Sequence, residues 1–199
     1  STLFPYTTLF RSDILLGKVN PSGKLNVSFP RSTGNTPCFY NHFVTDREEP
    51  FDQPGTPEEP KGHYIFDKPE PLWNFGHGKS YTTFDYVDCA LSDTLLAASD
   101  TLKVSVMIKN TGRCDGKEVV QLYVRDKVST VATPIQQLKA FQKELVPVGY
   151  TREVKLVLPI AELALYNADM EEVIEPGEFE LQIGSASDDI RIRRTIIVR

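Results

Sequence analysis

Residues 102–125 read LKVSVMIKNTGRCDGKEVVQLYVR, and this stretch decides the fold. Its first part, residues 102–109, places Leu, Val, Val and Ile at every second position, which is the period of a strand with one buried face. The sequence Asn110-Thr111-Gly112 is typical of a turn, and Asp115-Gly116 opens a second apolar run at residues 118–125. The stretch therefore predicts two consecutive strands joined by a glycine-containing loop.

The same pattern continues on both sides of this stretch. Further short segments of alternating or mostly apolar residues, separated by Gly, Pro, Asn or Asp, lie at residues 84–91, 137–146, 154–158, 178–183 and 190–198. About seven short strands with turns between them are typical of a β-sandwich. We therefore expect one such domain over residues 80–199, in which residues 160–166 form one helical turn before an edge strand.

Residues 13–30 have a different character. Asp13 to Gly17 (DILLG) is typical of the last turn of a helix that a glycine closes. Residues 20–23 (NPSG) predict a tight turn, and residues 24–29 (KLNVSF) predict a half-buried strand. A helix, turn and strand have too few partners to bury an apolar face by themselves. We therefore expect this segment to be the tail of a larger α/β unit.

Residues 31–79 are expected to form a proline-rich connector. Nine of the 14 prolines lie between Pro21 and Pro71. Because proline offers no backbone donor to a helix or a sheet, an extended conformation is favoured. The segment also keeps more aromatic residues than a free linker would, at positions 39, 40, 43, 51, 64, 66, 73 and 75. We infer that the connector packs along a surface.

The composition is that of an ordinary globular protein. Of 199 residues, 40% are hydrophobic and 25% are charged, which argues against collagen-like, coiled-coil and wholly disordered chains. The net charge of −5 gives no electrostatic reason to expect a nucleic-acid partner. No apolar run approaches the roughly 20 residues of a membrane helix, so we expect no membrane span.

Residues 1–12 (STLFPYTTLFRS) fit nothing that follows them. They lack the cationic start and apolar core of a signal peptide. The stretch resembles the forward translation of a common sequencing-adapter oligonucleotide. We therefore expect it to be non-native, and the reading frame to have been cut at its 5′ end. A real β-like edge segment is the alternative.

Residue chemistry alone identifies no active site. Gly78-Lys79-Ser80 lacks the glycine of a phosphate-binding loop, because Trp73 stands at that position and a strand-like segment follows. The three histidines and three cysteines have no metal-ligand spacing, so we expect no metal, no cofactor and no disulfide framework. Carboxylates are plentiful, but their spacing selects no pair for glycoside hydrolysis.

Several motifs, in order along the chain, resemble glycoside hydrolase family 3. Residues 17–25 (GKVNPSGKL) resemble the end of the family's second catalytic-half domain. Residues 71–84 (PLWNFGHGKSYTTF) are close to its proline-leucine, phenylalanine-glycine-tyrosine-glycine-leucine-serine-tyrosine signature, and the likeness continues colinearly to residue 199. His77 and Lys79 stand where tyrosine and leucine are usual, which suggests a more polar bend at the domain junction.

The resemblance implies a three-part enzyme with a barrel domain, an α/β sandwich and a fibronectin type III-like sandwich. The implied fold of this chain is mostly β. A fibronectin type III-like (immunoglobulin-like) β-sandwich at 80–199 follows the C-terminal end of the α/β sandwich domain at 13–30 and the connector at 31–79. The implied parent is a bacterial, periplasmic or secreted β-glucosidase-like enzyme that hydrolyses O-glycosyl bonds with retention.

In the family, the aspartate nucleophile and the glutamate acid/base lie in the upstream barrel and α/β domains. No carboxylate here aligns with either, so we expect no catalytic residue in this chain. We expect a stabilising and positioning role, the upstream domains as partners, and a β-glucoside or oligosaccharide substrate bound through the parent. Loops of the connector can approach the family's substrate cleft, which makes Asn41, His42, Asp46 and Arg47 the candidate sugar contacts.

A standalone carbohydrate-binding or structural β-sandwich module is the alternative function. It would explain residues 80–199 equally well. It gives no reason for the helix, turn and strand expected at residues 13–30, which a standalone module does not need.

Overall fold

The computed structural model describes residues 11–43, 57, 68 and 70–199. Within these residues the protein is mostly β, as the alternation predicted. Two short 3₁₀ helices form, η1 (Thr33–Asn35) and η2 (Ile160–Leu163). The strands are β1 (Phe84–Leu91), β2 (Leu95–Leu96), β3 (Thr101–Asn110), β4 (Gly116–Asp126), β5 (Gln137–Val146), β6 (Thr151–Pro159), β7 (Leu165–Tyr166), β8 (Glu172–Val173), β9 (Gly177–Ala186) and β10 (Asp189–Val198).

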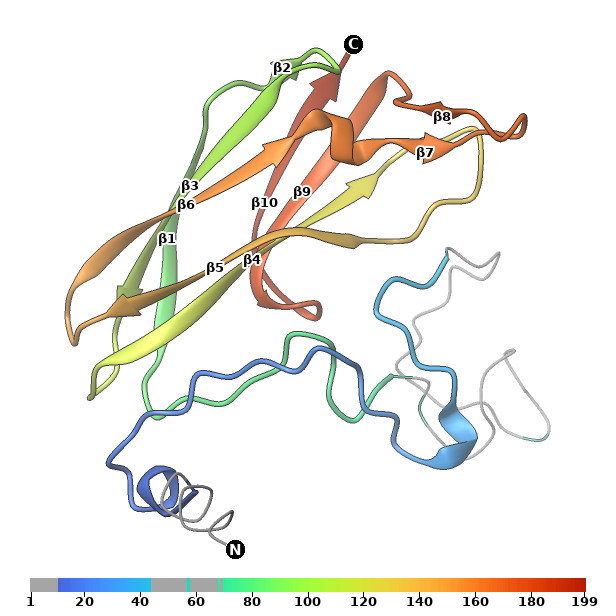
Figure 1. Ribbon diagram of the computed structural model, residues 1–199. Helices are drawn as coiled ribbons and strands as arrows, with labels where there is room; N and C mark the ends of the chain where they lie inside the picture. The colour runs from blue at the N-terminus through green and yellow to red at the C-terminus, as the bar shows by residue number, and fades with distance from the viewer. Residues whose placement is uncertain (1–10, 44–56, 58–67, 69) are drawn as a thin grey trace, which may run out of the picture.

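Two sheets face each other and form the predicted β-sandwich (Figure 1). One has the strand order β1-β3-β6 and the other β2-β10-β9-β4-β5, while β7 and β8 form a small hairpin. In the first sheet Val104 of β3 lies opposite Leu156 of β6. In the second, Val124 of β4 lies opposite Leu181 of β9.

The hydrophobic core lies between the two sheets. Every second side chain of β3 points into it, and each of these is fully buried, as the spacing predicted. Full burial of one such aliphatic side chain contributes about 1.5–3 kcal/mol. The β3 residues and their partners from the facing sheet are Leu102, Val104, Val106, Ile108, Val120, Leu122, Leu181, Ile183 and Ile196.

The short elements are partly as expected. The helical turn predicted before an edge strand is η2, followed directly by β7, which pairs with β8. The two-residue strands β2 and β8 were not anticipated, because two residues are too few to show an alternation. β2 pairs in parallel with the end of β10, where Leu95 lies opposite Ile197.

The helix end predicted before Gly17 is confirmed. Residues 11–15 are helical, and the amide of Leu16 donates to the carbonyl of Ser12 over 2.8 Å. Gly17 has a φ of 71°, the left-handed conformation that favours glycine. Residues 11 and 12 belong to this helical stretch, whereas residues 1–10 lie outside the described residues.

The tight turn predicted at residues 20–23 is wrong. These residues are irregular, with no turn assigned. Asn20 explains this, because its side chain bonds to the sandwich instead of closing a local turn. Its Oδ1 accepts from the amide of Tyr81 over 2.8 Å, and its Nδ2 donates to the carbonyl of Asp115 over 3.0 Å.

The strand predicted at residues 24–29 is also wrong as a regular, half-buried strand. It bonds irregularly to residues 72–77, with a single bridge between Phe29 and Trp73. The amide of Leu25 donates to the carbonyl of His77 over 2.8 Å, and the amide of Phe29 donates to the carbonyl of Trp73 over 2.8 Å. Val27 and Phe29 remain 54% and 41% exposed.

We call residues 20–29 and 70–80 together the junction ribbon. Its two segments run side by side beneath β4 and the β9–β10 turn in Figure 1. The side-chain amide of Gln121 donates to the carbonyl of Gly76 over 3.4 Å, and the backbone amide of Ser187 donates to the carbonyl of Phe75 over 2.9 Å. The ribbon is therefore bonded to the five-stranded sheet.

Part of the connector contacts the sandwich through aromatic rings. Tyr40 stacks on Phe75 with ring centroids 4.1 Å apart and meets the edge of buried Tyr123 at 5.9 Å. Most of residues 44–69 lies outside the described residues, so the extended connector stays a prediction. None of the described helices is both long and apolar enough to cross a membrane.

Candidate functional site

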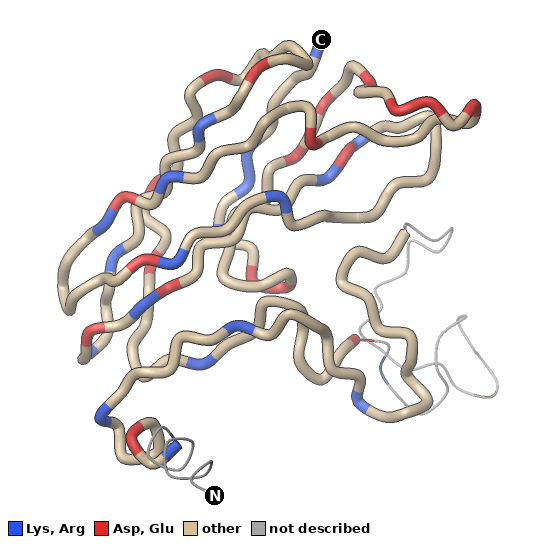
Figure 2. Tube along the Cα trace, viewed as in Figure 1, with Lys and Arg blue, Asp and Glu red and all other residues tan. Residues whose placement is uncertain are grey.

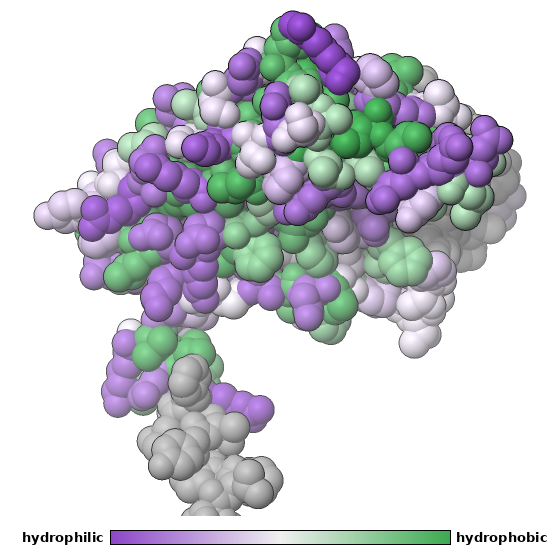
Figure 3. All heavy atoms as spheres, turned by 45° about the horizontal axis from the view of Figure 1, so that its top comes forward, coloured by the Kyte–Doolittle hydropathy of each residue, from purple (hydrophilic) through white to green (hydrophobic). Residues whose placement is uncertain are grey.

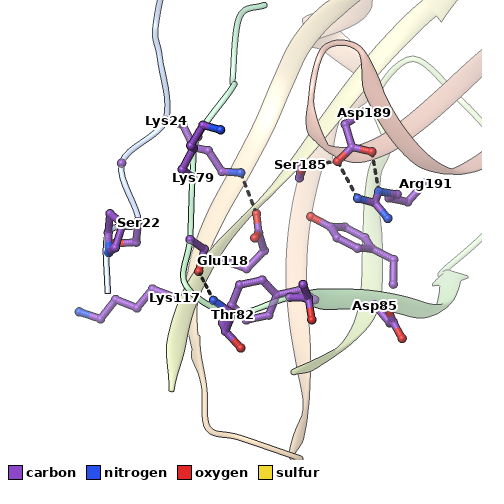
Figure 4. A pocket seen from close by; sticks show the side chains of 17 residues that line it. Ser22, Lys24, Lys79, Thr82, Asp85, Lys117, Glu118, Ser185, Asp189 and Arg191 are labelled. Atoms are coloured by element: carbon purple, nitrogen blue, oxygen red, sulfur yellow. Dashed lines mark hydrogen bonds and ion pairs between the residues drawn. The ribbon is translucent and has the colours of Figure 1, made fainter. Parts of the chain in front are cut away.

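A cleft of about 370 Å³ lies between the junction ribbon and the sandwich (Figure 4). The ribbon contributes residues 21–24 and 78–80 to its walls. The sandwich contributes the beginnings of β1 and β4 and both strands of the β9–β10 hairpin. The polar side chains labelled in Figure 4 are Ser22, Lys24, Lys79, Thr82, Asp85, Lys117, Glu118, Ser185, Asp189 and Arg191.

One wall carries a largely buried ion pair. Nζ of Lys24 lies 3.1 Å from Oε1 of Glu118, and their side chains are 17% and 8% exposed. Glu118 stands near the start of β4, where its carboxylate also accepts from the amide of Val119 over 3.0 Å. The pair thus links the junction ribbon directly to the sandwich.

The opposite wall carries a hydrogen-bonded carboxylate. Asp189 accepts from Arg191 twice, at 2.6 Å from Nε and 2.8 Å from Nη2, and from Oγ of Ser185 over 2.5 Å. Burial alone would raise the pKa of Asp189, but the bonds from Arg191 and Ser185 outweigh it and hold that pKa below its usual value. The bond from Asp189 in turn raises the pKa of Arg191.

Tyr86 of β1 also lines the cleft. Its hydroxyl is buried and has no hydrogen-bond partner among the described residues. Burial raises the pKa of Tyr86 far above its usual value, and the nearby carboxylates of Glu118 and Asp189 raise it further. The hydroxyl therefore stays protonated. It can both donate and accept a hydrogen bond, and it has no partner among the described residues for either.

The sequence-predicted site residues lie elsewhere. Asn41 is half-buried and His42 is exposed, and neither lines the cleft. The carbonyl of His42 accepts from the amide of Ile135 over 2.9 Å, which places it beside the loop between β4 and β5. Asp46 and Arg47 lie outside the described residues. Their role in sugar binding stays a prediction.

Sequence reasoning missed the polar residues of the cleft. Tyr86, Glu118 and Asp189 come from three different strands, and each stands within a stretch that looks like an ordinary strand or turn. Neither their spacing nor their local composition distinguishes them from surface residues. The polar bend suggested by His77 and Lys79 is the nearest signal, since Lys79 lines the cleft.

Figure 2 shows acidic residues along the β7–β8 hairpin, among them Asp169, Glu171 and Glu172. Across the part of the chain that the structure describes, no three His, Cys, Asp or Glu side chains are grouped to hold a metal ion. The face in Figure 3 shows apolar side chains in small groups among polar ones.

Two family models match the chain. Residues 11–81 match the glycosyl hydrolase family 3 C-terminal domain, and residues 118–187 match the fibronectin type III-like domain. The junction ribbon lies within the first matched segment, and the second matched segment runs from β4 to β9 of the sandwich. Both assignments agree with the resemblance found in the sequence.

Curated relatives and solved structures give the same result. A β-xylosidase of Formosa agariphila is 39% identical over 90% of this chain and 24% of its own length. A periplasmic β-glucosidase of Salmonella typhimurium is 37% identical over 90% of this chain and 23% of its own length. The crystal structure of a β-glucosidase from Listeria innocua in complex with isofagomine superposes with a TM-score of 0.82 and 35% identity, over 94% of this chain and 26% of that one.

The chain thus spans about a quarter of the length of the relatives that it matches. The likeness covers both the junction ribbon and the sandwich, in the order in which the two family models match. The chain therefore belongs to glycoside hydrolase family 3, and it carries segments that match the family's C-terminal domain and the fibronectin type III-like domain.

Proposed function

We propose that this chain is the C-terminal part of a β-glucosidase-like, retaining glycoside hydrolase and that it stabilises and positions the catalytic domains. In this proposal residues 13–30 complete the α/β domain, residues 31–79 are the connector and residues 80–199 are the fibronectin type III-like domain. One observation carries it. The junction ribbon is joined to the sandwich by a buried ion pair and by several hydrogen bonds, so the two segments hold a defined geometry.

The substrate class follows from the relatives. Those named above are a β-xylosidase and β-glucosidases, so the parent of this chain would act on a β-glucoside or a related oligosaccharide. A retaining mechanism needs two carboxyl groups about 5–5.5 Å apart. We place both in the upstream barrel and α/β domains, which are the expected partners of this chain. The periplasmic relative supports a periplasmic or secreted location.

Two connector residues would lie closest to the substrate. The side chain of His42 is exposed, and that of Asn41 is half-buried beside it. An amide and an imidazole are suitable hydrogen-bond partners for sugar hydroxyls. In this proposal Asn41 and His42, together with Asp46 and Arg47, face the substrate cleft of the assembled enzyme and contribute to binding.

The test uses the Salmonella typhimurium relative as a host. Its matching C-terminal quarter is replaced by residues 13–199 of this chain, and hydrolysis of an aryl β-glucoside is measured. We expect the chimera to hydrolyse the substrate, this chain alone to show no turnover above background, and the host without its C-terminal quarter to lose activity. Turnover by this chain alone, or a shortened host as active as the intact one, would contradict the proposal.

A further inference from the structure

The walls of the cleft beside Tyr86 are built from closely packed backbone. A side chain at Gly78 would place its Cβ 2.5 Å from the carbonyl oxygen of Gly23, so the two segments of the junction ribbon touch there. On the other side, Gly184 of β9 packs against the backbone of Asp189 and Ile190. The cleft is therefore a formed hollow, and its volume of about 370 Å³ is at the small end of the range for ligand sites.

Two ion pairs occupy the two facing walls of the cleft. Figure 4 shows Lys24 directed at Glu118 and Arg191 directed at Asp189, so these two cations already have a carboxylate partner. Lys79 also lines the cleft, and among the described residues no carboxylate forms an ion pair with it. A bound anion would face these two carboxylates, and a bound cation would face Lys24 and Arg191. Lys117 extends away from the cleft in the same view. The two paired walls therefore favour a neutral ligand.

The hydroxyl of Tyr86 shows what kind of neutral ligand fits. It is buried near the charges of Glu118 and Asp189 and has no hydrogen-bond partner among the described residues. A ligand hydroxyl can accept a hydrogen bond from it and donate one to Glu118 or Asp189 at the same time. Bonds between a hydroxyl and a charged group are also stronger than bonds between neutral groups. An apolar ligand would leave the Tyr86 hydroxyl without a partner.

We propose that this cleft is a non-catalytic binding site for a neutral polyhydroxylated ligand of about one sugar ring, recognised by Tyr86, Glu118 and Asp189. The site goes beyond the hydrolase function proposed above and does not depend on it. Because it lies where the junction ribbon meets the sandwich, a bound sugar bridges the two and stabilises their contact.

The experiment titrates the full 199-residue chain with glucose and with xylose, using ligand-observed NMR and the thermal midpoint of unfolding. Inorganic phosphate serves as the anionic probe. We expect saturable sugar binding and a midpoint that rises with sugar concentration. Phosphate is expected to produce neither effect. Absence of saturable sugar binding, or phosphate binding that the sugar displaces, would overturn the proposal.

Matched variants locate the binding. Tyr86→Phe removes only the hydroxyl and is expected to weaken sugar binding by about fivefold or more, as the loss of one buried hydrogen bond predicts. Tyr150→Phe makes the same change at an exposed position outside the cleft, and should bind sugar unchanged. Ser185→Ala is a second variant of the lining, because it removes the hydroxyl that donates to Asp189. It is also expected to weaken sugar binding, and it tests the site if Tyr86→Phe fails to fold. Equal affinity in all of these variants would rule out this site.

Discussion

Lys24 and Glu118 form a largely buried ion pair between the junction ribbon and the sandwich, with Nζ and Oε1 3.1 Å apart. Each side chain belongs to a segment matched by a different family model. Their burial distinguishes this pair from the exposed ion pairs of the strands, such as Lys155 with Glu153. The pair is therefore an interaction on which the geometry between the two segments depends.

Removing one partner of this pair should destabilise the junction. Glu118→Gln leaves the ammonium group of Lys24 in a largely buried site without its counter-charge, and we expect a loss of about 3 kcal/mol in the free energy of unfolding. Glu153→Gln breaks the exposed pair with Lys155 and should cost under about 1 kcal/mol. Urea unfolding followed by the fluorescence of the single tryptophan, Trp73 in the ribbon, measures both. Equal effects of the two substitutions would show that the buried pair has no special role.

The backbone at Gly76 should tolerate no side chain. Gly76 has a φ of 80°, and a Cβ there would collide with the side chain of Gln121 and come within 3.0 Å of Cα of Ala186. Gly149 has a similar φ of 76° but open space around it. Gly149→Ala should therefore cost only the left-handed backbone penalty of about 1–2 kcal/mol. Gly76→Ala should cost clearly more and detach the ribbon, measured by urea unfolding and Trp73 fluorescence.

Residues 81–199 should fold without the preceding segments. All the side chains of the core cluster belong to residues 84–198, so the apolar burial that stabilises the sandwich is complete within this part. A chain beginning at Tyr81 should unfold in one cooperative transition on heating, as small single domains do. Far-UV circular dichroism and limited proteolysis measure this. Rapid cleavage throughout β3, β4 and β9 would contradict it.

The sandwich could be predicted from the sequence because its signal is local. Alternation in β3 requires only that one face of a strand be buried, and a period of two residues shows this directly. The junction ribbon could not be predicted, because its shape depends on Asn20 bonding to Tyr81 and Asp115, residues far away along the chain. The cleft was missed for the same reason. Glu118 looks like any strand-edge carboxylate until the fold brings Lys24 to it.

Asp189 and Asp126 should respond to pH in opposite directions. The pKa of Asp189 is lowered in the fold, because bonds from Arg191 and Ser185 outweigh its burial, so its ionised form stabilises the native state. That stabilisation is complete above the unfolded pKa of about 3.9 and is lost as pH falls through the lower folded pKa. Asp189→Asn should therefore destabilise the protein at pH 6, and the difference from the unmodified chain should shrink by pH 3.

Asp126 is the matched control for this prediction. Burial raises its pKa in the fold, so its ionised form disfavours the native state above about pH 4. An asparagine there retains an oxygen that can accept from the amide of Val128, as the aspartate does over 3.1 Å. Asp126→Asn should therefore stabilise the protein at pH 6, with an effect that fades by pH 3. Urea unfolding at both pH values measures the two variants, and a change of the same sign in both would refute the assignment of their pKa shifts.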